Sequence, residues 1–214
     1  MQLEGVDAAT EVVENLRLLE LFSGTGSIGR SFRARGWDVT AIDNDPKANA
    51  TICCDIASWN VDSLQGNRID AIWASPPCTN YSTLRSSTEE DRMSSDELVK
   101  KTLEIAEALG NPPMFIENPY TGKLKERGLL DHLSMQVVDY CTYGMPYRKR
   151  TAIWTNTNWT PARPLCRHNC ASSNGKTHTA RAQQGPPGPR FTQKQLYRIP
   201  GELCDEIALF CTRL

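Results

Sequence analysis

The sequence has 214 residues, 39% hydrophobic and 23% charged, with a formal net charge of −1, which is enough chain for one domain with its own core. The first 15 residues carry four acids and no base, and no apolar run approaches the roughly 20 residues that cross a bilayer, so we expect neither a secretory signal nor a membrane span. Eight scattered cysteines favour reduced thiols in an intracellular protein, in the cytoplasm or nucleoid, or in a nucleus, over a disulfide framework.

The first two thirds of the chain alternate predicted strands and helices. A glycine-rich turn at 23–29 leads into a helical segment that extends to about residue 35. A second helix is expected to begin near Ser94, where Glu97 would complete a capping box. Four apolar runs are typical of buried strands: 16–22, 37–42, 69–74 and 114–117. This alternation predicts an α/β fold with a parallel sheet flanked by helices.

The last third predicts less regular structure. Residues 135–141 and 151–155 look like two strands joined by a turn. The Gly-Pro-Pro-Gly-Pro segment at 185–189 cannot form a helix or strand. One closing helix is expected at 201–214, with Leu203, Ile207 and Phe210 facing inward.

Charge is distributed unevenly along the chain. Residues 1–139 carry a net charge of −9, whereas residues 140–198 carry ten bases and no acid. A segment this basic would attract a phosphate backbone, and its aromatic side chains could stack on bases. A solvated basic loop is the alternative, but nucleic-acid binding is the better interpretation. The aromatic residues concerned are Tyr143, Tyr147, Trp154, Trp159, Phe191 and Tyr197.

The glycine-rich turn has the spacing of a nucleotide-binding motif. Gly24, Gly26 and Gly29 form G-x-G-x-x-G between a predicted strand and a predicted helix, and Asp43 follows at the tip of the next strand. The glycines let the backbone approach a ligand closely, and Asp43 could accept hydrogen bonds from ribose hydroxyls. The pattern fits both a dinucleotide and S-adenosylmethionine.

Two further predicted strands end in chemically reactive groups. Cys78 follows two prolines at the end of the strand at 69–74, and Glu117 ends the strand at 114–117. Ligands bind at this edge of an open α/β sheet. A thiol has an ordinary pKa of about 8.5, so Cys78 would need a cation or a closed site to become a nucleophile. Glu117 in a partly dry site could donate a proton to a ring nitrogen.

Taken in order, these motifs resemble those of the cytosine-carbon-5 DNA methyltransferases. The resemblance rests on Glu20–Ser27, Ser75–Cys78, Glu117–Pro119 and Tyr143–Arg150, with Tyr197–Cys204 similar to the family's C-terminal motif. It implies a Rossmann-like S-adenosylmethionine-dependent methyltransferase sheet with a small irregular recognition segment. The implied parts are a catalytic domain at 1–155, a basic recognition segment at 156–196, and a helix at 197–214 that returns to the catalytic domain.

The resemblance also implies roles for single residues. Cys78 would add to carbon 6 of a flipped cytosine, Glu117 would hold or protonate ring nitrogen 3, and Arg148 and Arg150 would bind the extruded nucleotide. DNA is the implied partner, with no membrane, and the chain could act as a monomer or with a second chain. The implied S-adenosylmethionine-binding residues are Phe22, Ser23, Gly24, Thr25, Gly26, Ser27, Asp43, Asn44, Asp55, Ile56, Ser75 and Pro76.

The sequence departs from the family's pattern in four ways. Pro119 stands where valine is usual, and Tyr147 stands where glutamine is usual. The turn that carries Arg148 and Arg150 is one residue short, so their individual roles stay open. The recognition region is also unusually small, at about 40 residues.

Four residues of zinc-ligand type lie within that small region: Cys166, His168, Cys170 and His178. A structural zinc ion would let a segment too small for a core of its own hold one shape. Reduced thiols and phosphate-facing histidines in a flexible loop are the alternative. Cys53, Cys54, Cys141, Cys204 and Cys211 are expected to be small core residues.

The leading hypothesis is therefore a cytosine-5 DNA methyltransferase. Three alternatives are kept: the same chemistry on transfer RNA, an oxidoreductase that uses the glycine motif for a dinucleotide, and a DNA-binding relative without activity. The oxidoreductase leaves Cys78 and Glu117 without a role, and an inactive relative would not need them.

Overall fold

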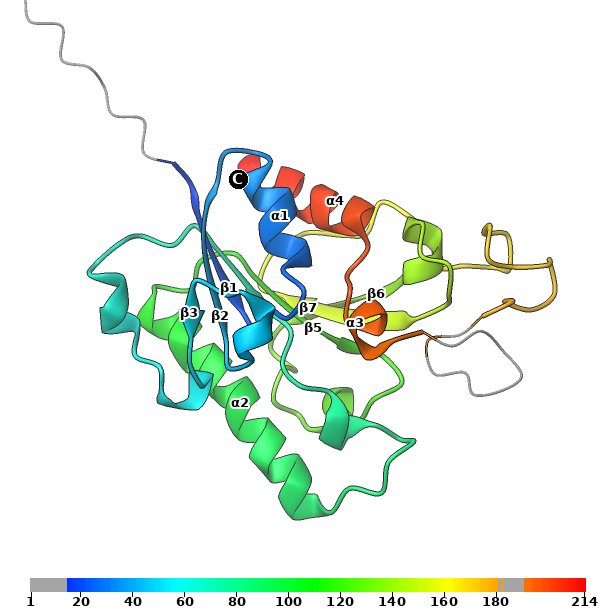
Figure 1. The fold of residues 1–214 in the computed structure, drawn as a ribbon, viewed down its shortest axis with the longest axis horizontal. Helices are drawn as coiled ribbons and strands as arrows, with labels where there is room; N and C mark the ends of the chain where they lie inside the picture. The colour runs from blue at the N-terminus through cyan, green and yellow to red at the C-terminus, as the bar shows by residue number, and fades with distance from the viewer. Residues whose placement is uncertain (1–14, 181, 183–190) are drawn as a thin grey trace, which may run out of the picture.

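A computed structural model describes residues 15–180, 182 and 191–214. Its centre is a seven-stranded sheet with the strand order β3-β2-β1-β4-β5-β7-β6 (Figure 1). The strands are β1 (Arg17–Leu21), β2 (Asp38–Asp43), β3 (Ile52–Cys53), β4 (Ala71–Ala74), β5 (Met114–Pro119), β6 (Ser134–Asp139) and β7 (Arg150–Thr155). The α/β class and the helix-flanked sheet expected from the sequence are confirmed.

Strand direction divides the sheet into two parts. Strands β1 to β5 run parallel, and β7 is inserted antiparallel between β5 and β6. From β1 the chain moves outward to β2 and β3, and then crosses to the other side of β1 to form β4. The crevice between the carboxyl ends of β1 and β4 is therefore the switch point where open α/β sheets bind ligands.

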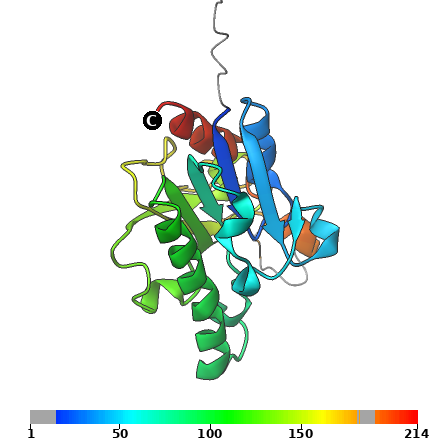
Figure 2. The same ribbon diagram turned by 90° about the vertical axis from the view of Figure 1, so that its left-hand side faces the viewer.

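Helices cover both faces of the sheet (Figures 1 and 2). On one face α1 (Ser27–Arg33) lies beside α4 (Gly201–Thr212), and on the other lies α2 (Glu89–Ala108). A short helix, α3 (Gln193–Leu196), precedes α4. Short 3-10 turns connect several elements: η1 (Pro46–Ala48), η2 (Ile56–Ser58), η3 (Val61–Leu64), η4 (Thr79–Tyr81), η5 (Leu124–Glu126) and η6 (Tyr140–Tyr143).

The buried strand β1 shows why two layers of helices are needed. Leu18 packs into the core beneath α1 and α4, whereas Leu19 and Leu21 pack into the core beneath α2. Successive side chains of a strand point to opposite faces, so an apolar run without polar alternation requires cover on both sides. The alternation of strands and helices in the sequence had predicted this parallel sheet.

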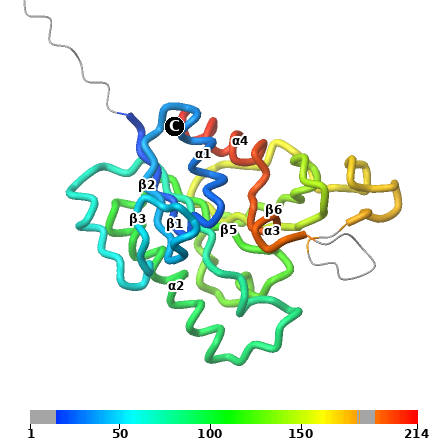
Figure 3. Tube along the Cα trace, in the orientation of Figure 1, coloured from blue at the N-terminus to red at the C-terminus, as the bar shows by residue number. Residues whose placement is uncertain are grey.

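The C-terminal segment returns to the start of the fold, as the tube in Figure 3 shows for α3, α4 and α1. The Ile199 backbone N–H donates to the Ser27 hydroxyl at 3.3 Å, and the Trp37 indole donates to the Thr212 hydroxyl at 3.0 Å. Leu203 and Ile207 are buried against the sheet as expected, and Phe210 packs against the same core. The last helix thus holds α1 and the turn before it in place.

The start of α2 was predicted wrongly. The helix begins at Glu89 and not near Ser94, because Thr88 and Asp91 form the capping box in place of the pair ending at Glu97. Strand β3 and helix α3 were not predicted, since each is too short to show a periodic pattern.

The predicted pairing of the last two strands is confirmed, with Val137 opposite Ala152. The segment at 185–189 lies outside the described residues. Among the helices that are described, none has the length and apolarity that crossing a bilayer requires.

Candidate active site

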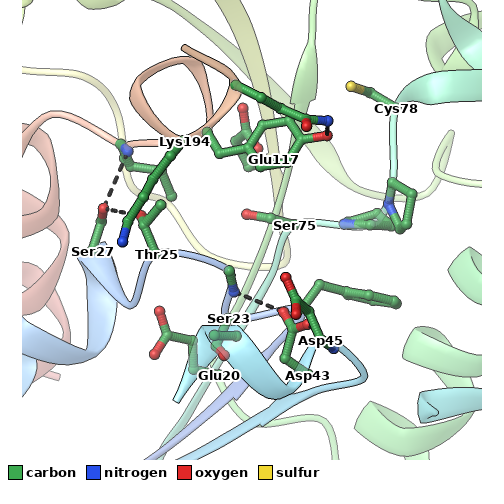
Figure 4. A pocket seen from close by; sticks show the side chains of 18 of the residues that line it. Glu20, Ser23, Thr25, Ser27, Asp43, Asp45, Ser75, Cys78, Glu117 and Lys194 are labelled. Carbon is green, nitrogen blue, oxygen red and sulfur yellow. Dashed lines mark hydrogen bonds between the residues drawn. The ribbon is translucent and has the colours of Figure 1, made fainter. Parts of the chain in front are cut away.

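A cavity of about 500 Å³ lies at the carboxyl ends of β1, β2, β4 and β5. Its walls come from the glycine-rich turn, the tip of β2, the loop that carries Cys78, and the end of β5, with α3 closing one side. In Figure 4 the carboxyl groups of Glu20, Asp43 and Asp45 lie at one end, Cys78 and Glu117 lie at the other, and Ser75 lies between them. The cavity has the size of a small-ligand site.

Asp43 ties the glycine-rich turn to the tip of β2. Its carboxylate accepts hydrogen bonds from the backbone N–H groups of Gly24 and Asp45, both at 2.8 Å. Gly24 has a φ of +50°, a backbone conformation that glycine adopts without strain. Phe22 has a φ of +55° although it carries a side chain, so the chain leaves β1 through a strained residue that lines the cavity.

Glu20 is a site residue that the sequence analysis did not single out. Its side chain is buried among apolar strands, and burial raises the pKa of its carboxyl to about 7 from an ordinary 4.5. Oxygen Oε2 has no hydrogen-bond partner among the described residues, and Glu20 lines the cavity. A Cβ on Gly29 would come within 2.5 Å of this oxygen, so Gly29 leaves the room that Glu20 needs. The available signal was an acid inside an apolar strand.

Most of the expected cofactor residues meet in the cavity. Gly26 does not line it, but it starts α1 with a φ of +63° and so shapes the turn. Asp55 and Ile56 also do not line it, because the Asp55 carboxylate caps η2 and Ile56 is buried in the core. Asp45, Lys47 and Ala48 line the cavity on that side instead. The expected residues that do line it are Phe22, Ser23, Gly24, Thr25, Ser27, Asp43, Asn44, Ser75 and Pro76.

The loop that carries Cys78 is held at two points. The Asn118 side-chain amide, fully buried at the end of β5, donates to the Pro76 carbonyl at 2.9 Å. The Trp73 indole donates to the Ser75 hydroxyl at 2.9 Å. Together with the two prolines, these bonds restrict the backbone that places the Cys78 thiol at the mouth of the cavity.

Charged groups of both signs surround Cys78. Burial and the nearby Glu117 carboxylate raise the pKa of the Cys78 thiol, and the Lys149 ammonium acts in the opposite direction. Glu117 accepts a hydrogen bond from the Tyr140 hydroxyl at 3.1 Å, and Lys149 Nζ lies 3.6 Å from Glu117 Oε1. Cys78 is therefore mainly a thiol at neutral pH, and its thiolate is favoured only where Lys149 outweighs Glu117.

Lys149, and not Arg148 or Arg150, is the cation beside Cys78 and Glu117. The register places Ile153 opposite Glu117, and the alternation of side chains puts Lys149 on the face of Glu117 and Arg150 on the other face. Arg150 forms a two-pronged bond with Asp139, at 3.0 and 2.8 Å, and Arg148 lies 3.5 Å from the same carboxylate. Both arginines are thus paired with Asp139, and both also line the outer cleft, so their binding of the nucleotide stays a prediction.

A second, wider cleft of about 1030 Å³ opens beside the first cavity. Cys78, Pro119, Lys149 and Tyr197 belong to the walls of both. Arg148, Arg150, Thr177, His178 and Ala182 also line the outer cleft. The Cys78 thiol therefore lies where a cofactor-sized cavity meets a basic cleft.

Most of the aromatic residues proposed to stack on bases do not face solvent. Tyr143, Tyr147, Trp154 and Trp159 are buried, so that expectation is wrong for them. Tyr147 instead donates its hydroxyl to the Gln195 carbonyl at 2.8 Å and packs on Phe191, which anchors α3. Tyr197 is half exposed and lies on the walls of both cavities.

Three of the four residues expected to bind zinc lie together in the structure. Cys166, Cys170 and His178 converge, but the fourth member of the cluster is Cys141 and not His168. His168 has a left-handed backbone, and its ring lies 4.8 Å from the His178 ring without joining the cluster. Cys141, Cys204 and Cys211 are buried as expected, whereas Cys53 is exposed.

Comparison with known proteins decides the family. Residues 16–121 match the family described as C-5 cytosine-specific DNA methylase. One relative is a protein of Frog virus 3 (isolate Goorha) named probable DNA (cytosine-5)-methyltransferase. It is 30% identical to this chain over 219 residues, which cover 92% of this chain and 100% of that protein. This chain belongs to the C-5 cytosine-specific DNA methylase family. The oxidoreductase alternative therefore has no support.

A solved structure supports the fold. An Entamoeba histolytica methyltransferase is similar with a TM-score of 0.53 at 16% identity, over 72% of this chain and 58% of that one. This chain thus spans less than two thirds of that methyltransferase, and the likeness concerns the Rossmann-like fold alone.

The cavity fits S-adenosylmethionine, the cofactor of this family. The unpartnered Glu20 oxygen and the unpartnered Ser23 hydroxyl both belong to residues that line it. A buried carboxyl group with one oxygen left unpartnered suits a ligand that carries a positive charge. Asp43 keeps lone pairs for ribose hydroxyls after its two backbone bonds.

Proposed function

We propose that this protein methylates carbon 5 of cytosine in DNA through a transient covalent bond to Cys78. The observation that carries the proposal is the position of Cys78 on the shared wall of the cofactor-sized cavity and the basic cleft, with Glu117 and Lys149 beside it. A methyl donor on one side and a nucleotide on the other would both reach the thiol.

The residues that would hold S-adenosylmethionine are Glu20, Ser23, Gly24 and Asp43, with Ser75 toward the thiol. When bound, the cofactor supplies an electrophilic methyl group to carbon 5. Glu20 would take the cationic part of the ligand, since its carboxyl ionises more easily beside a positive charge. Asp43 would accept hydrogen bonds from ribose hydroxyls.

The chain's own residues then activate the ring. The Cys78 thiolate donates an electron pair to carbon 6. Glu117, in its carboxylic acid form, donates a hydrogen bond or proton to ring nitrogen 3, where negative charge develops. Carbon 5 thereby becomes nucleophilic and takes up the methyl group. Loss of the carbon 5 proton to a base forms the double bond between carbons 5 and 6 and expels the Cys78 thiolate, and a proton held on ring nitrogen 3 returns to Glu117.

Lys149 has two effects in this scheme. Its ammonium favours the thiolate of Cys78, and its contact with Glu117 Oε1, 3.6 Å away, holds the carboxyl in the cavity. Its amine also donates to the Leu196 carbonyl at 3.2 Å, which connects the pair to α3. We therefore assign Lys149 a positioning and electrostatic role.

The outer cleft would receive the flipped base. Extruding a cytosine from a duplex requires about a few kcal/mol of lost stacking, which contacts in the cleft must offset. Tyr197 is exposed on its wall and can stack on a base, and Arg148 keeps enough exposure to contact a phosphate.

The test is methylation of DNA and of transfer RNA in parallel, with nucleoside mass spectrometry for 5-methylcytosine. We expect the mark in DNA, and its loss in Cys78→Ser. DNA that carries 5-fluorocytosine should remain bonded to Cys78, because fluorine cannot leave as the proton does, and peptide mapping identifies the residue.

Three results would contradict the proposal. A mark in transfer RNA alone would favour the RNA substrate. Binding of DNA without any transfer would favour an inactive relative. A Cys78→Ser variant as active as the parent would exclude the covalent route.

A further inference from the structure

Four potential metal ligands converge outside the methyl-transfer site. Cys141 comes from η6, directly after β6, and Cys166, Cys170 and His178 come from the loop that follows β7. The three sulfur atoms and a ring nitrogen all lie within 4.8 Å of one another. Cys141, Cys166 and His178 are buried, and Cys170 is half-buried.

The distances within the cluster fit tetrahedral zinc. Nitrogen Nε2 of His178 lies 3.4 Å from the Cys141 sulfur and 3.3 Å from the Cys166 sulfur. Bonds of about 2.3 Å from zinc to sulfur and about 2.0 Å to nitrogen place two ligand atoms about 3.5 Å apart in a tetrahedron. None of the eight cysteines, all of which are described, forms a disulfide.

The surrounding loop lacks other means of holding its shape. Between β7 and α3, the described residues form neither helix nor strand, and an isolated bridge pairs Ser173 with His178. Most side chains of this loop are exposed, and Figure 1 shows it (gold) extending away from the sheet. A segment of this kind has no core of its own, which is the situation in which structural zinc stabilises a fold.

Hydrogen bonds connect the cluster to the outer cleft. The Cys166 backbone N–H donates to Asp139 at 3.0 Å, and the same carboxylate binds Arg150. The Arg148 backbone N–H donates to the Ala180 carbonyl at 3.1 Å. His178 itself lies on the wall of the outer cleft that also contains Cys78.

We propose that Cys141, Cys166, Cys170 and His178 bind one structural zinc ion, which fixes the loop at 156–180 as a wall of the outer cleft. Binding replaces three thiol protons with bonds to the metal, and four protein ligands leave no open position for catalysis. This inference concerns metal binding and does not rest on the proposed methyl transfer.

The test is the metal content of the full-length protein, purified without a histidine tag and measured by mass spectrometry of the elements. We expect about one zinc per chain. Cys141→Ser and Cys170→Ser should lose it, while His168→Asn and Cys53→Ser should keep it. The pair Cys141→Ser and His168→Asn is decisive, because the sequence alone favoured His168.

A second measurement covers variants that fail to fold. Cobalt exchanged into the unmodified protein should give the absorption of a tetrahedral ion bound to three thiolates, and a chelator should speed protease cleavage within 156–180. A folded protein without zinc, loss of zinc in His168→Asn but not in Cys141→Ser, or a disulfide between two of the three cysteines would overturn the proposal.

Discussion

The thiol of Cys78 lies between opposing charges, and this balance controls its reactivity. Burial and Glu117 raise its pKa, and Lys149 lowers it. Below its pKa a thiol reacts in proportion to the thiolate fraction, which increases about tenfold for each pH unit. Methylation should therefore accelerate from neutral toward alkaline pH, as long as the fold is intact.

Two substitutions beside Cys78 should act in opposite directions. Lys149→Met removes the stabilising cation, so alkylation of Cys78 by iodoacetamide at pH 7.5 should slow by roughly two- to fivefold. Glu117→Gln removes the opposing charge, so alkylation should accelerate although methylation is lost. Peptide mass spectrometry separates Cys78 from exposed Cys53.

Lys101→Met, on the surface of α2, is the matched control and should leave the alkylation rate of Cys78 unchanged. If Lys149→Met and Glu117→Gln shifted the rate in the same direction, the proposed charge balance would be wrong.

Glu20 links pH to stability. The pKa of its carboxyl is about 7 in the fold against an ordinary 4.5. Between pH 4.5 and pH 7 the folded state therefore keeps a proton that the unfolded state has released. Stability should therefore fall as the pH rises from about 4.5 to about 7 and then level off. Gln at position 20 cannot ionise, so at pH 8 Glu20→Gln should unfold at a higher urea concentration than the parent. We expect its free energy of unfolding to be larger by on the order of 3 kcal/mol.

The gain should shrink toward pH 4.5, and Glu104→Gln on the exposed side of α2 should show no such trend. A gain that is independent of pH would mean that the Glu20 carboxyl is not responsible. Binding of S-adenosylmethionine to Glu20→Gln, measured by calorimetry, should weaken.

At the scale of elements, strand β5 serves two purposes at its two ends. At the amino end, the Met114 backbone N–H donates to the Asn156 side chain at 2.8 Å, which fixes the strand. At the carboxyl end, Asn118 holds the Pro76 carbonyl and thereby the loop with Cys78. One end stabilises the fold, and the other orients the loop that carries Cys78, the proposed nucleophile.

These two asparagines form a matched pair for mutation. Asn118→Ala and Asn156→Ala each remove hydrogen bonds worth about 1–3 kcal/mol, so both should unfold at lower urea. Asn118→Ala should also lower kcat by at least about tenfold, because a displaced nucleophile loses alignment. Asn156→Ala should keep the parent kcat at a temperature where it is folded. Equal kcat values for the two variants would remove the positioning role of Asn118.

At the scale of the whole molecule, acidic and basic side chains gather in different places. The carboxylates of Glu20, Asp43 and Asp45 line the cavity. Arg148, Lys149 and Arg150 line the outer cleft, and Arg167 and Lys176 are exposed on the loop beside it. A cavity with three carboxylates at one end, next to a cleft lined by three bases, suits a cationic cofactor and a polyanionic substrate.

DNA binding should therefore weaken steeply with salt. A complex with about six phosphate contacts loses about a thousandfold in affinity between 50 and 200 mM salt. Arg167 and Lys176 are both exposed on the loop. Because Arg167→Met and Lys176→Met would each remove one phosphate contact, each should make the slope of log affinity against log salt concentration shallower by about one. The control pair Lys100→Met and Lys101→Met lies on α2 and should leave the slope unchanged. Fluorescence anisotropy over a salt series checks this, and a slope near zero would exclude the basic segment as the DNA contact.

The sequence by itself determined the local and chain-ordered features. Buried strands, the glycine turn, Asp43, Cys78 and Glu117 follow from short-range patterns, because strand ends in a parallel sheet meet at one edge whatever the exact register. Only the tertiary structure decided which side chains meet across that edge. The antiparallel insertion of β7 put Lys149 beside Glu117 and paired Arg150 with Asp139, and it brought Cys141 to Cys166 in place of His168. These choices depend on register and on contacts between distant segments, which residue spacing does not encode.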